Sequence, residues 1–311
     1  MDVSSVKGPC SVWATAQRNA PAQRRGRYTR ASTAHPAKML PAIAAHAITT
    51  YTRPGDWVLD PMCGTGTTLV EAAHAGRNGL GIEYEPRWAQ AAAENLALAE
   101  RSGAPGHGQI LIGDARSLPT VIPPELHGRF ALVVTSPPYG ASVHGRVRST
   151  RDSGEPGVHK FNDAYGTDRA NLAHQPLARL LDGFTDILTG CAAVLRPGGH
   201  VVVTTRPWRR GGELIDLPGL AAACGQAAGL VFEERCVALL AAIRDGELIP
   251  RPSFFALHNA RTAAQAGNPQ AVIVHEDVLI LAKVALPGSS REPKGVQAKP
   301  DGPQPRAAVP R

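Results

Sequence analysis

The chain has 311 residues, of which 43% are hydrophobic and 19% are charged, and its formal net charge is +7. Such a chain is long and apolar enough to bury a large core, which excludes a wholly disordered protein and a small disulfide-stapled one. Five cysteines without paired spacing, no charged-then-apolar leader and no apolar run of membrane-spanning length predict a cytoplasmic protein without a membrane segment.

The first part of the chain is strongly basic. Before Gly55 the sequence has a single acid, Asp2, against many arginines. Such an excess is typical of a segment that binds a polyanion, most often nucleic acid, although a solvated tail has the same composition. We therefore expect residues 1–34 to form a basic N-terminal arm that contacts nucleic acid.

After this arm the pattern alternates between amphipathic helices and apolar strands. Helices are predicted at 41–51, 67–75, 86–101 and 177–195, and strands at 57–60, 79–83, 110–112, 130–135, 200–205, 230–243 and 272–284. This alternation predicts an α/β fold with a parallel sheet and helices on both faces. We expect it to occupy residues 35–286, with insertions at about 141–173 and 245–269, and a disordered tail at 287–311.

A glycine-rich loop follows the first predicted strand and reads Asp60-Pro61-Met62-Cys63-Gly64-Thr65-Gly66-Thr67. Gly64 and Gly66 allow a ligand to approach the backbone, and the helix that starts near Thr67 offers free N–H groups to an anion. Leu69 stands where a dinucleotide-binding loop has its third glycine, and no Lys-Ser/Thr pair follows as in a phosphate-binding P-loop. The loop therefore predicts a site for a small carboxylate and argues against a nicotinamide-dependent oxidoreductase.

Two acids end the next two strands. Glu83 is placed to accept hydrogen bonds from ribose hydroxyls, and Asp114 to accept one from an adenine amino group, because ligands bind at the carboxyl ends of parallel strands. Each acid taken alone is more often a helix cap or a surface carboxylate. Together with the carboxylate-binding loop, in which Cys63 lines the pocket, they predict S-adenosyl-L-methionine (SAM) as the cofactor.

The fourth predicted strand ends in Thr135-Ser136-Pro137-Pro138-Tyr139. The two prolines fix the backbone and remove two N–H donors, so the loop presents rigid acceptors. The Ser136 hydroxyl and the Pro137 carbonyl are suited to bind the hydrogens of an exocyclic amine and to favour a nucleophilic nitrogen. Tyr139 offers a face on which an extracted base stacks. The loop predicts methyl transfer to a nucleobase amine.

Five motifs in this order resemble the DNA amino-methyltransferases, the family that methylates N4 of cytosine or N6 of adenine. They are His35-Pro36-Ala37-Lys38, the glycine loop from Asp60 to Thr68, GIEYEP from Gly81 to Pro86, Gly113-Asp114-Ala115, and TSPPY. The resemblance implies the Rossmann-like fold of SAM-dependent methyltransferases, with a mostly parallel seven-stranded sheet. The roles it implies are cofactor binding for His35, Lys38, Asp60, Gly64, Gly66, Thr67, Glu83 and Asp114, and catalysis for Ser136, Pro137, Pro138 and Tyr139.

The substrate stays open at this point. A serine before Pro-Pro-Tyr is usual for N4-cytosine enzymes, and Asp or Asn for N6-adenine enzymes, so Ser136 favours cytosine in DNA. No separate target-recognition domain is evident, so any sequence preference is expected from the two insertions. The alternatives are an RNA enzyme acting on a guanine amine in transfer RNA, and a non-catalytic nucleic-acid-binding protein on the same scaffold. No metal site is predicted, because the histidine spacing fits no ligand pattern.

Overall fold

The computed structural model describes residues 10–138, 146–148, 159–161, 165–166, 168–210, 212–252 and 254–285. Its centre is an eight-stranded sheet in the order β1-β11-β14-β8-β5-β2-β3-β4. These strands are β1 (Val12–Trp13), β2 (Trp57–Asp60), β3 (Asn78–Glu83), β4 (His107–Ile112), β5 (Phe130–Thr135), β8 (Leu195–Thr205), β11 (Val231–Leu239) and β14 (His275–Ala282). β14 is antiparallel to both of its neighbours, and the other pairings in this sheet are parallel.

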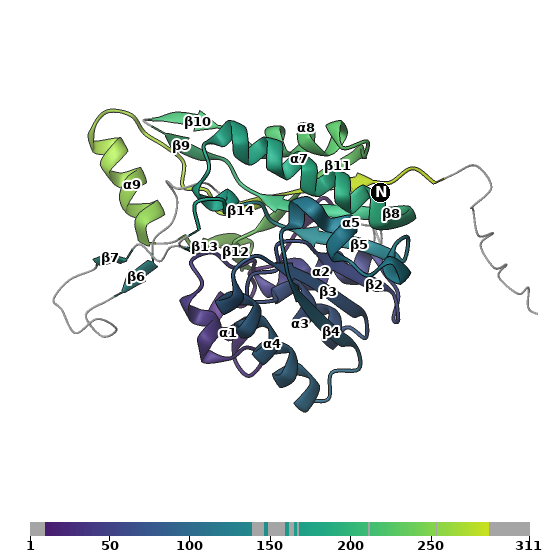
Figure 1. The fold of residues 1–311 in the computed structure, drawn as a ribbon. Coiled ribbons are helices and arrows are strands. Elements are labelled where there is room, and N and C mark those ends of the chain that lie inside the picture. Colours follow the sequence, from purple (N-terminus) through teal and green to yellow (C-terminus); the bar gives the residue numbers. More distant parts are fainter. Residues whose placement is uncertain are drawn as a thin grey trace, which may run out of the picture.

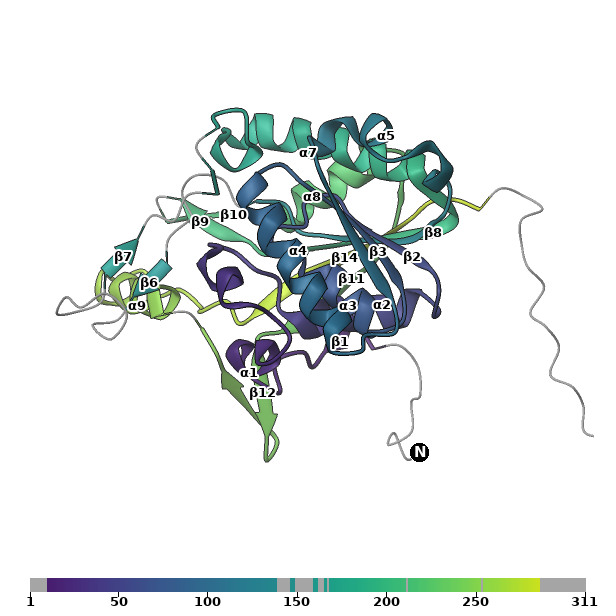
Figure 2. The same cartoon turned by 60° about the horizontal axis from the view of Figure 1, so that its bottom comes forward.

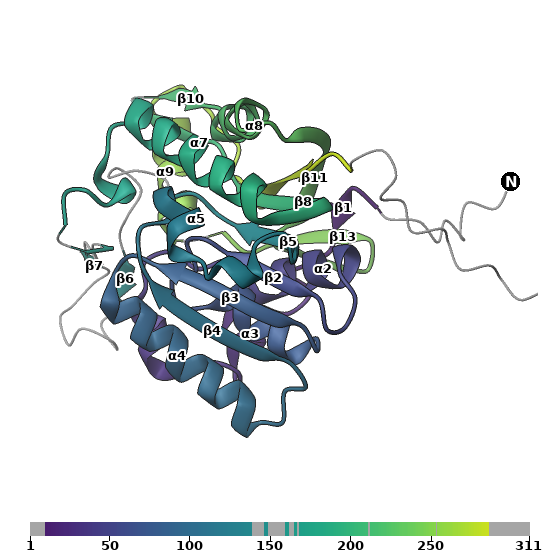
Figure 3. The ribbon, with the colours of Figure 1, turned by 45° about the vertical axis from the view of Figure 1, so that its right-hand side comes forward.

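Helices cover both faces of this sheet (Figures 1 and 3). One face carries α2 (Pro41–Tyr51), α3 (Thr67–His74) and α4 (Pro86–Arg101), and the other carries α5 (Leu118–Val121), α7 (Leu177–Val194) and α8 (Leu217–Ala227). Alternate strand residues serve the two cores: Val58 and Val202 pack with α2, whereas Leu59 and Val203 pack with α7. A strand covered on both faces requires apolar residues at every position. The predicted Rossmann-like fold is confirmed, with one strand more than the seven expected.

The additional strand comes from the basic N-terminal segment. β1 pairs with β11 at the sheet edge, Val12 opposite Val237, and Trp13 is buried in the core that also contains α2. α1 (Ala20–Arg24) and η1 (Arg30–Ala34) follow along the domain. Residues 10–34 thus form part of the domain and differ from the separate arm expected. The reason is that burying one large apolar side chain, here Trp13, stabilises the folded state by about 1.5–3 kcal/mol. The basic composition of the segment gives no indication of this contribution.

Two arginines of this segment are bound to the domain. Arg24 donates to the Met39 carbonyl at 2.6 Å, and Arg27 forms an ion pair with the buried Glu71 at 2.8 Å. Arg25 between them is exposed. Some of the arginines that were expected to contact nucleic acid therefore bind other parts of the protein.

Further elements lie beside the sheet. They are η2 (Ala115–Ser117), η3 (Pro124–Leu126), η4 (Leu172–His174), α9 (Phe254–Gln265) and three strand pairs: β6 (Arg146–Arg148) with β7 (His159–Phe161), β9 (Trp208–Arg210) with β10 (Glu213–Ile215), and β12 (Ala241–Arg244) with β13 (Glu247–Pro250). Figure 2 shows the β12–β13 hairpin projecting from the body of the protein and α9 beside β6 and β7. Over the described residues, no helix is both long and apolar enough to cross a bilayer.

Two sequence expectations in the last third differ from the structure. The strand expected at 230–243 is divided at Leu240 into β11 and β12, and the polar insertion 245–269 contains α9. Helix α8 was not expected, because its Ala- and Gly-rich sequence has little amphipathic contrast. The tail 287–311 lies outside the described residues.

Candidate active site

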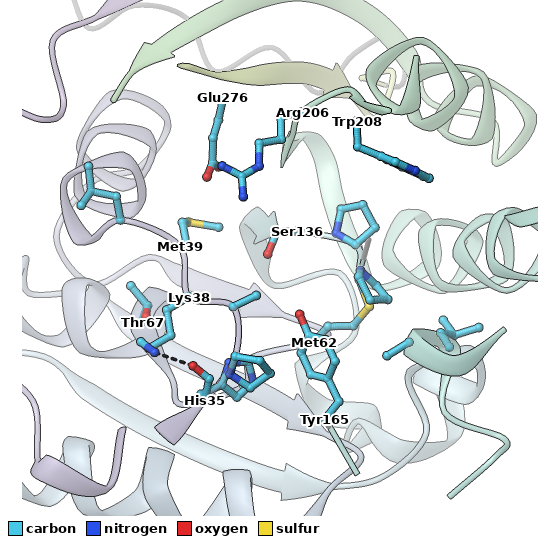
Figure 4. Close-up of a pocket in the computed structure, with 18 of the residues that line it drawn as sticks. His35, Lys38, Met39, Met62, Thr67, Ser136, Tyr165, Arg206, Trp208 and Glu276 are labelled. Carbon is cyan, nitrogen blue, oxygen red and sulfur yellow. Dashed lines mark hydrogen bonds between the residues drawn. The ribbon is translucent and has the colours of Figure 1, made fainter. Parts of the chain in front are cut away.

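The carboxyl ends of the central strands open into one cavity of about 1100 Å³. The glycine loop, Glu83 and Asp114 line one end of it, which we call the glycine end. Ser136 to Pro138, Arg206 and Glu276 line the other, which we call the proline end. Figure 4 shows Ser136 between Arg206 and Glu276 on one side and Thr67 and His35 on the other. Motifs that lie 70 residues apart in the sequence, counted from Gly66 to Ser136, thus border a single hollow.

The glycine loop takes a backbone shape that other residues rarely adopt. Gly64 has φ of 53° and Gly66 has φ of 76°. A Cβ atom on Gly64 would lie 3.1 Å from His35 Nε2, and one on Gly66 would lie 3.1 Å from Ala92 Cβ. Gly66 is also the N-cap of α3 and has no side chain to bind the first-turn N–H groups. These donors suit the anionic group of a ligand, although Gly66 itself does not line the cavity, unlike Gly64 and Thr67.

Leu69 explains how α3 comes close to the sheet without a third glycine in the loop. A Cβ on Gly81 would lie 2.6 Å from Leu69 Cδ1 and 2.7 Å from Cys63 Sγ, and one on Gly79 would lie 3.2 Å from Leu69 Cδ2. The small residues are therefore on β3 and the large one is on the helix. Cys63 is buried in this contact and also lines the cavity, as expected.

Two buried acids hold the loop in place. Glu83 accepts from Gly64 N at 2.7 Å and from Glu85 N at 2.9 Å, while Asp60 accepts from Thr68 Oγ1 at 2.6 Å and from Met62 N at 3.1 Å. Burial raises the pKa of Glu83, and it raises the pKa of Asp60 to about 7 against the opposing effect of the Thr68 hydrogen bond. Both acids line the cavity, and each carboxylate has further lone pairs to offer a ligand.

Asp114 has a different environment from the other two acids. It caps η2 by accepting from Arg116 N at 3.0 Å, and it also accepts from Arg116 Nε at 2.9 Å. This hydrogen-bonded guanidinium holds the pKa of Asp114 below its usual range. The residue lines the glycine end as expected, but its carboxylate is already engaged by a neighbour in the same turn.

His35 and Lys38 lie over the glycine loop (Figure 4). The His35 ring is buried, packs edge-on against Trp88 with ring centroids 4.6 Å apart, and contacts the position of Gly64. Burial, followed by the charge of Lys38, lowers the pKa of His35 to about 3, so the ring is neutral at physiological pH. Lys38 Nζ donates to the His35 carbonyl. The motif thus places a neutral imidazole ring and the positively charged Lys38 beside the loop.

Three residues at the glycine end were not expected from the sequence. Buried Asn95 donates to Thr65 O at 2.7 Å and accepts from Ser32 Oγ at 2.9 Å, which ties η1 to the loop. Arg24 reaches the cavity from α1, and the Tyr165 ring lies 5.2 Å from His35. Only Asn95 gives a signal in the sequence, as an amide within the buried face of an amphipathic helix.

The proline end begins where β5 ends. Thr135 and Pro137 are buried, and Ser136 and Pro138 are partly buried beside the cavity. Tyr139 lies outside the described residues, so its stacking role stays a prediction. Ser136, Pro137 and Pro138 thus border the same hollow as the glycine loop, as the sequence predicted.

Residues from distant strands complete the proline end. Arg206 follows β8, Trp208 lies in β9, and Glu276 lies in β14. All three line the cavity, and Trp208 also packs against the fully buried Leu217. Burial raises the pKa of Glu276, while the positive charge of Arg206 acts in the opposite direction.

Comparison with known proteins shows which sequences this chain is similar to. Residues 4–94 match the N6_N4_Mtase family, described as DNA methylase. Over 43 residues the chain is 54% identical to the type II methyltransferase M.MthZI of Methanothermobacter thermautotrophicus, covering 14% of this chain and 12% of that protein. Over 110 residues it is 32% identical to a tRNA (guanine(10)-N2)-dimethyltransferase of the same species, covering 35% of this chain and 30% of that protein.

The chain therefore spans less than a third of the length of these two relatives. Among solved structures, TrmN from Thermus thermophilus is 20% identical with a TM-score of 0.48, over 84% of this chain and 53% of that one. The family match confirms the resemblance to the amino-methyltransferases, and with it S-adenosyl-L-methionine as the cofactor that the resemblance implies.

Proposed function

We propose, from the match to the DNA methylase family, that this protein is a SAM-dependent methyltransferase acting on an exocyclic amine of a base in DNA. N4 of cytosine is the favoured target and N6 of adenine the second. The observation that carries the proposal is that the Ser136-Pro137-Pro138 loop and the glycine loop border one cavity. The cofactor site and the loop that binds the amine have to lie close together, because methyl transfer requires both reactants to be held in contact.

The residues at the glycine end suit the proposed cofactor. Gly64 lines the cavity, and the first turn of α3, which Gly66 leaves uncapped, offers N–H donors for the carboxylate. Glu83 and Asp60 are acceptors for hydroxyl and ammonium groups, and Asp114 lies beyond them for the adenine amine. When bound, the cofactor supplies an electrophilic methyl group. The neutral His35 adds no positive charge beside that cation.

The proline end is proposed to bind and activate the amine. The Ser136 hydroxyl and the Pro137 carbonyl accept the two amine hydrogens, which favours the pyramidal nitrogen that attacks. Because the prolines already fix these acceptors, little reorganisation is needed as charge develops. Tyr139 is proposed to stack on the base, which offsets part of the few kcal/mol that extraction from the duplex costs.

The match to the tRNA methyltransferase supports a second candidate. That relative is named for guanine in transfer RNA, and the segment it shares with this chain is longer than that of the DNA enzyme, 110 against 43 residues. Ser136 favours the DNA assignment, because an acidic or amide residue before Pro-Pro-Tyr is usual for the other targets. Either nucleic acid would be met in the cytoplasm, which we propose as the location.

One experiment tests the proposal and separates the candidates. The protein is expressed in a host without DNA methylation, and modified nucleosides in purified DNA and RNA are identified by mass spectrometry. We expect N4-methylcytosine in DNA, strongly reduced in a matched culture that expresses the Ser136→Ala variant. N2-methylguanine in transfer RNA alone would favour the second candidate. No new methylated base in either nucleic acid, together with no SAM uptake by calorimetry, would overturn the enzymatic function.

A further inference from the structure

Two oppositely charged residues face each other at the proline end. In the ladder between β14 and β8, Asp277 pairs with Thr205, so Glu276 and Arg206 are the next residues along the two strands. Both line the cavity, and Figure 4 shows their charged groups pointing into it and toward one another. The pair therefore lies at the ends of β8 and β14. This is the side of the Ser136 loop that faces away from the glycine end.

Withdrawing charged groups from water costs free energy, so we expect the two charges to have a function. Withdrawal of Glu276 from solvent raises its pKa, and Arg206 opposes that effect. Both residues are partly exposed, and opposite charges in such a position contribute little to stability, so the pair is weak evidence for a stabilising role. A charged pair on the wall of a binding cavity is better explained by what the cavity holds.

Ser136 and Arg206 follow two neighbouring strands of the sheet. β5 and β8 are hydrogen-bonded neighbours, with Thr135 opposite Val203, and adjacent strands lie about 4.8 Å apart. Residues that follow two neighbouring strands can therefore contact two points on the edge of one base. An amine held by Ser136 and Pro137 would leave the rest of that edge facing the residues that follow β8.

We propose that Arg206 reads the ring edge of the target base beside its amine, and that Glu276 is a positioning residue that orients the guanidinium. The inference rests on the proposed function and extends it by assigning the selection of the base. It gives the charged pair at the ends of β8 and β14 a role in specificity.

The chemistry of the three possible bases makes the selection definite. Next to its amine, cytosine has two acceptors, N3 and O2, whereas adenine has one acceptor, N1, followed by a C–H group. On the Watson–Crick edge, which is the edge compared for the other two bases, guanine has an N1–H donor beside its N2 amine. A guanidinium has donors only, arranged as a fork. Arg206 therefore satisfies cytosine with two hydrogen bonds and adenine with one, and it opposes guanine.

The test measures base preference, which two charged residues with a purely structural role would not change. Wild type, Arg206→Met, Arg206→Lys, Glu276→Gln and the control Arg129→Met are expressed in the methylation-free host. Arg129 is exposed in the turn before β5, at the opposite end of that strand from Ser136. N4-methylcytosine, N6-methyladenine and N2-methylguanine per copy of enzyme are quantified, with SAM affinity by calorimetry and thermal melting as companions.

We expect Arg206→Met to lower N4-methylcytosine about 10- to 100-fold, the discrimination that one bidentate base contact provides. The ratio of N4-methylcytosine to N6-methyladenine should fall with it, while SAM affinity stays at the wild-type value. Arg206→Lys keeps the charge beside Glu276 but lacks the fork, so it should shift the ratio in the same direction without lowering the melting temperature. Glu276→Gln should give a smaller shift, and Arg129→Met none.

Three results would overturn the inference. They are an unchanged base ratio in both Arg206 variants, an equal loss of all products with a lower melting temperature in both, and N2-methylguanine as the wild-type product. A wild type that methylates no base would instead overturn the proposed function, so the two failures are distinguishable.

Discussion

The two ends of the cavity are built in different ways. At the glycine end, the loop is held by residues of motifs that can be recognised in the sequence, such as Thr68 to Asp60 and Glu83 to Gly64. At the proline end, Ser136 meets Arg206 and Glu276 only through the pairing of β5, β8 and β14. The first end is therefore specified by local motifs and the second by topology. We expect changes at the first to affect cofactor binding and changes at the second to affect turnover and base choice.

The largest expected effect is from Gly64→Val. The new side chain meets His35 Nε2, which its Cβ alone would approach to 3.1 Å, and φ of 53° strains a β-branched residue. We expect loss of SAM binding in calorimetry. Gly246→Val is the matched control, since Gly246 has φ of 82° in the β12–β13 turn with nothing within 4 Å of its Cβ. Equal SAM affinity in the Gly64 variant and wild type would contradict the proposed cofactor site.

Ser136→Ala tests the proline end of the cavity. Removing one preorganised hydrogen-bonding group from a transition state typically costs about 10²- to 10³-fold in turnover. We expect a loss of that order in methyl transfer to DNA, with SAM affinity unchanged, because the loss falls on the transition state. Normal turnover in this variant would show that Ser136 has no catalytic role.

Asn95→Ala tests whether the glycine end depends on the N-terminal segment. The substitution leaves Thr65 O and Ser32 Oγ without the buried amide that binds them, which costs about 1–3 kcal/mol. We expect that loss in urea unfolding, together with weaker SAM binding. Gln90→Ala, at an exposed position of the same helix, is the control and should have little effect. Equal losses in both variants would show that the buried amide of Asn95 contributes no more than an exposed side chain of the same helix.

The raised pKa of Asp60 predicts a pH dependence of stability. Its carboxyl keeps its proton up to a pH of about 7 in the folded protein, against an ordinary value of 3.8. The folded state thus binds more protons than the unfolded state in that interval, so this residue lowers the free energy of unfolding as the pH rises from 3.8 to 7. Asp60→Asn should flatten this part of the profile, measured by urea unfolding across the interval. Parallel profiles would show that Asp60 does not titrate there.

The smallest expected effect comes from Arg209 and Arg210, which are exposed on β9 beside the proline end. If they bind phosphates, replacing both by Gln should weaken DNA binding and reduce the slope of log K against log salt by about 0.9 for each phosphate that is no longer neutralised. Base preference should not change, because phosphate contacts carry no sequence information. Arg101→Gln, at the exposed end of α4, is the control. An unchanged salt slope would place the DNA path elsewhere.

The sequence predicted the glycine end well and the proline end in part. Gly64, Glu83 and Ser136 could be placed because each follows directly from a strand with a clear apolar pattern. Glu276 could not, because its partner Arg206 is 70 residues earlier and only the antiparallel ladder brings them together. Asn95 is similar: its role depends on η1, which no local pattern indicates.

The N-terminal segment was the main difference between sequence and structure. Its arginines suggested an arm, but Trp13 has too much apolar surface to stay in water when an uncovered sheet edge is available. Residues that fold by pairing with a strand more than 200 positions away leave no periodic signal in their own neighbourhood, as the pair Val12 and Val237 illustrates.

This pairing also has a consequence for the order in which the protein is made. The strand at Val12 has to wait until the ribosome has added Val237, because its partner does not exist before then. The same segment carries Ser32, which is joined through Asn95 to the glycine loop. A nascent chain therefore cannot pair its first strand until its last strands emerge, and a protein truncated before β11 should be captured by chaperones or proteases rather than accumulate.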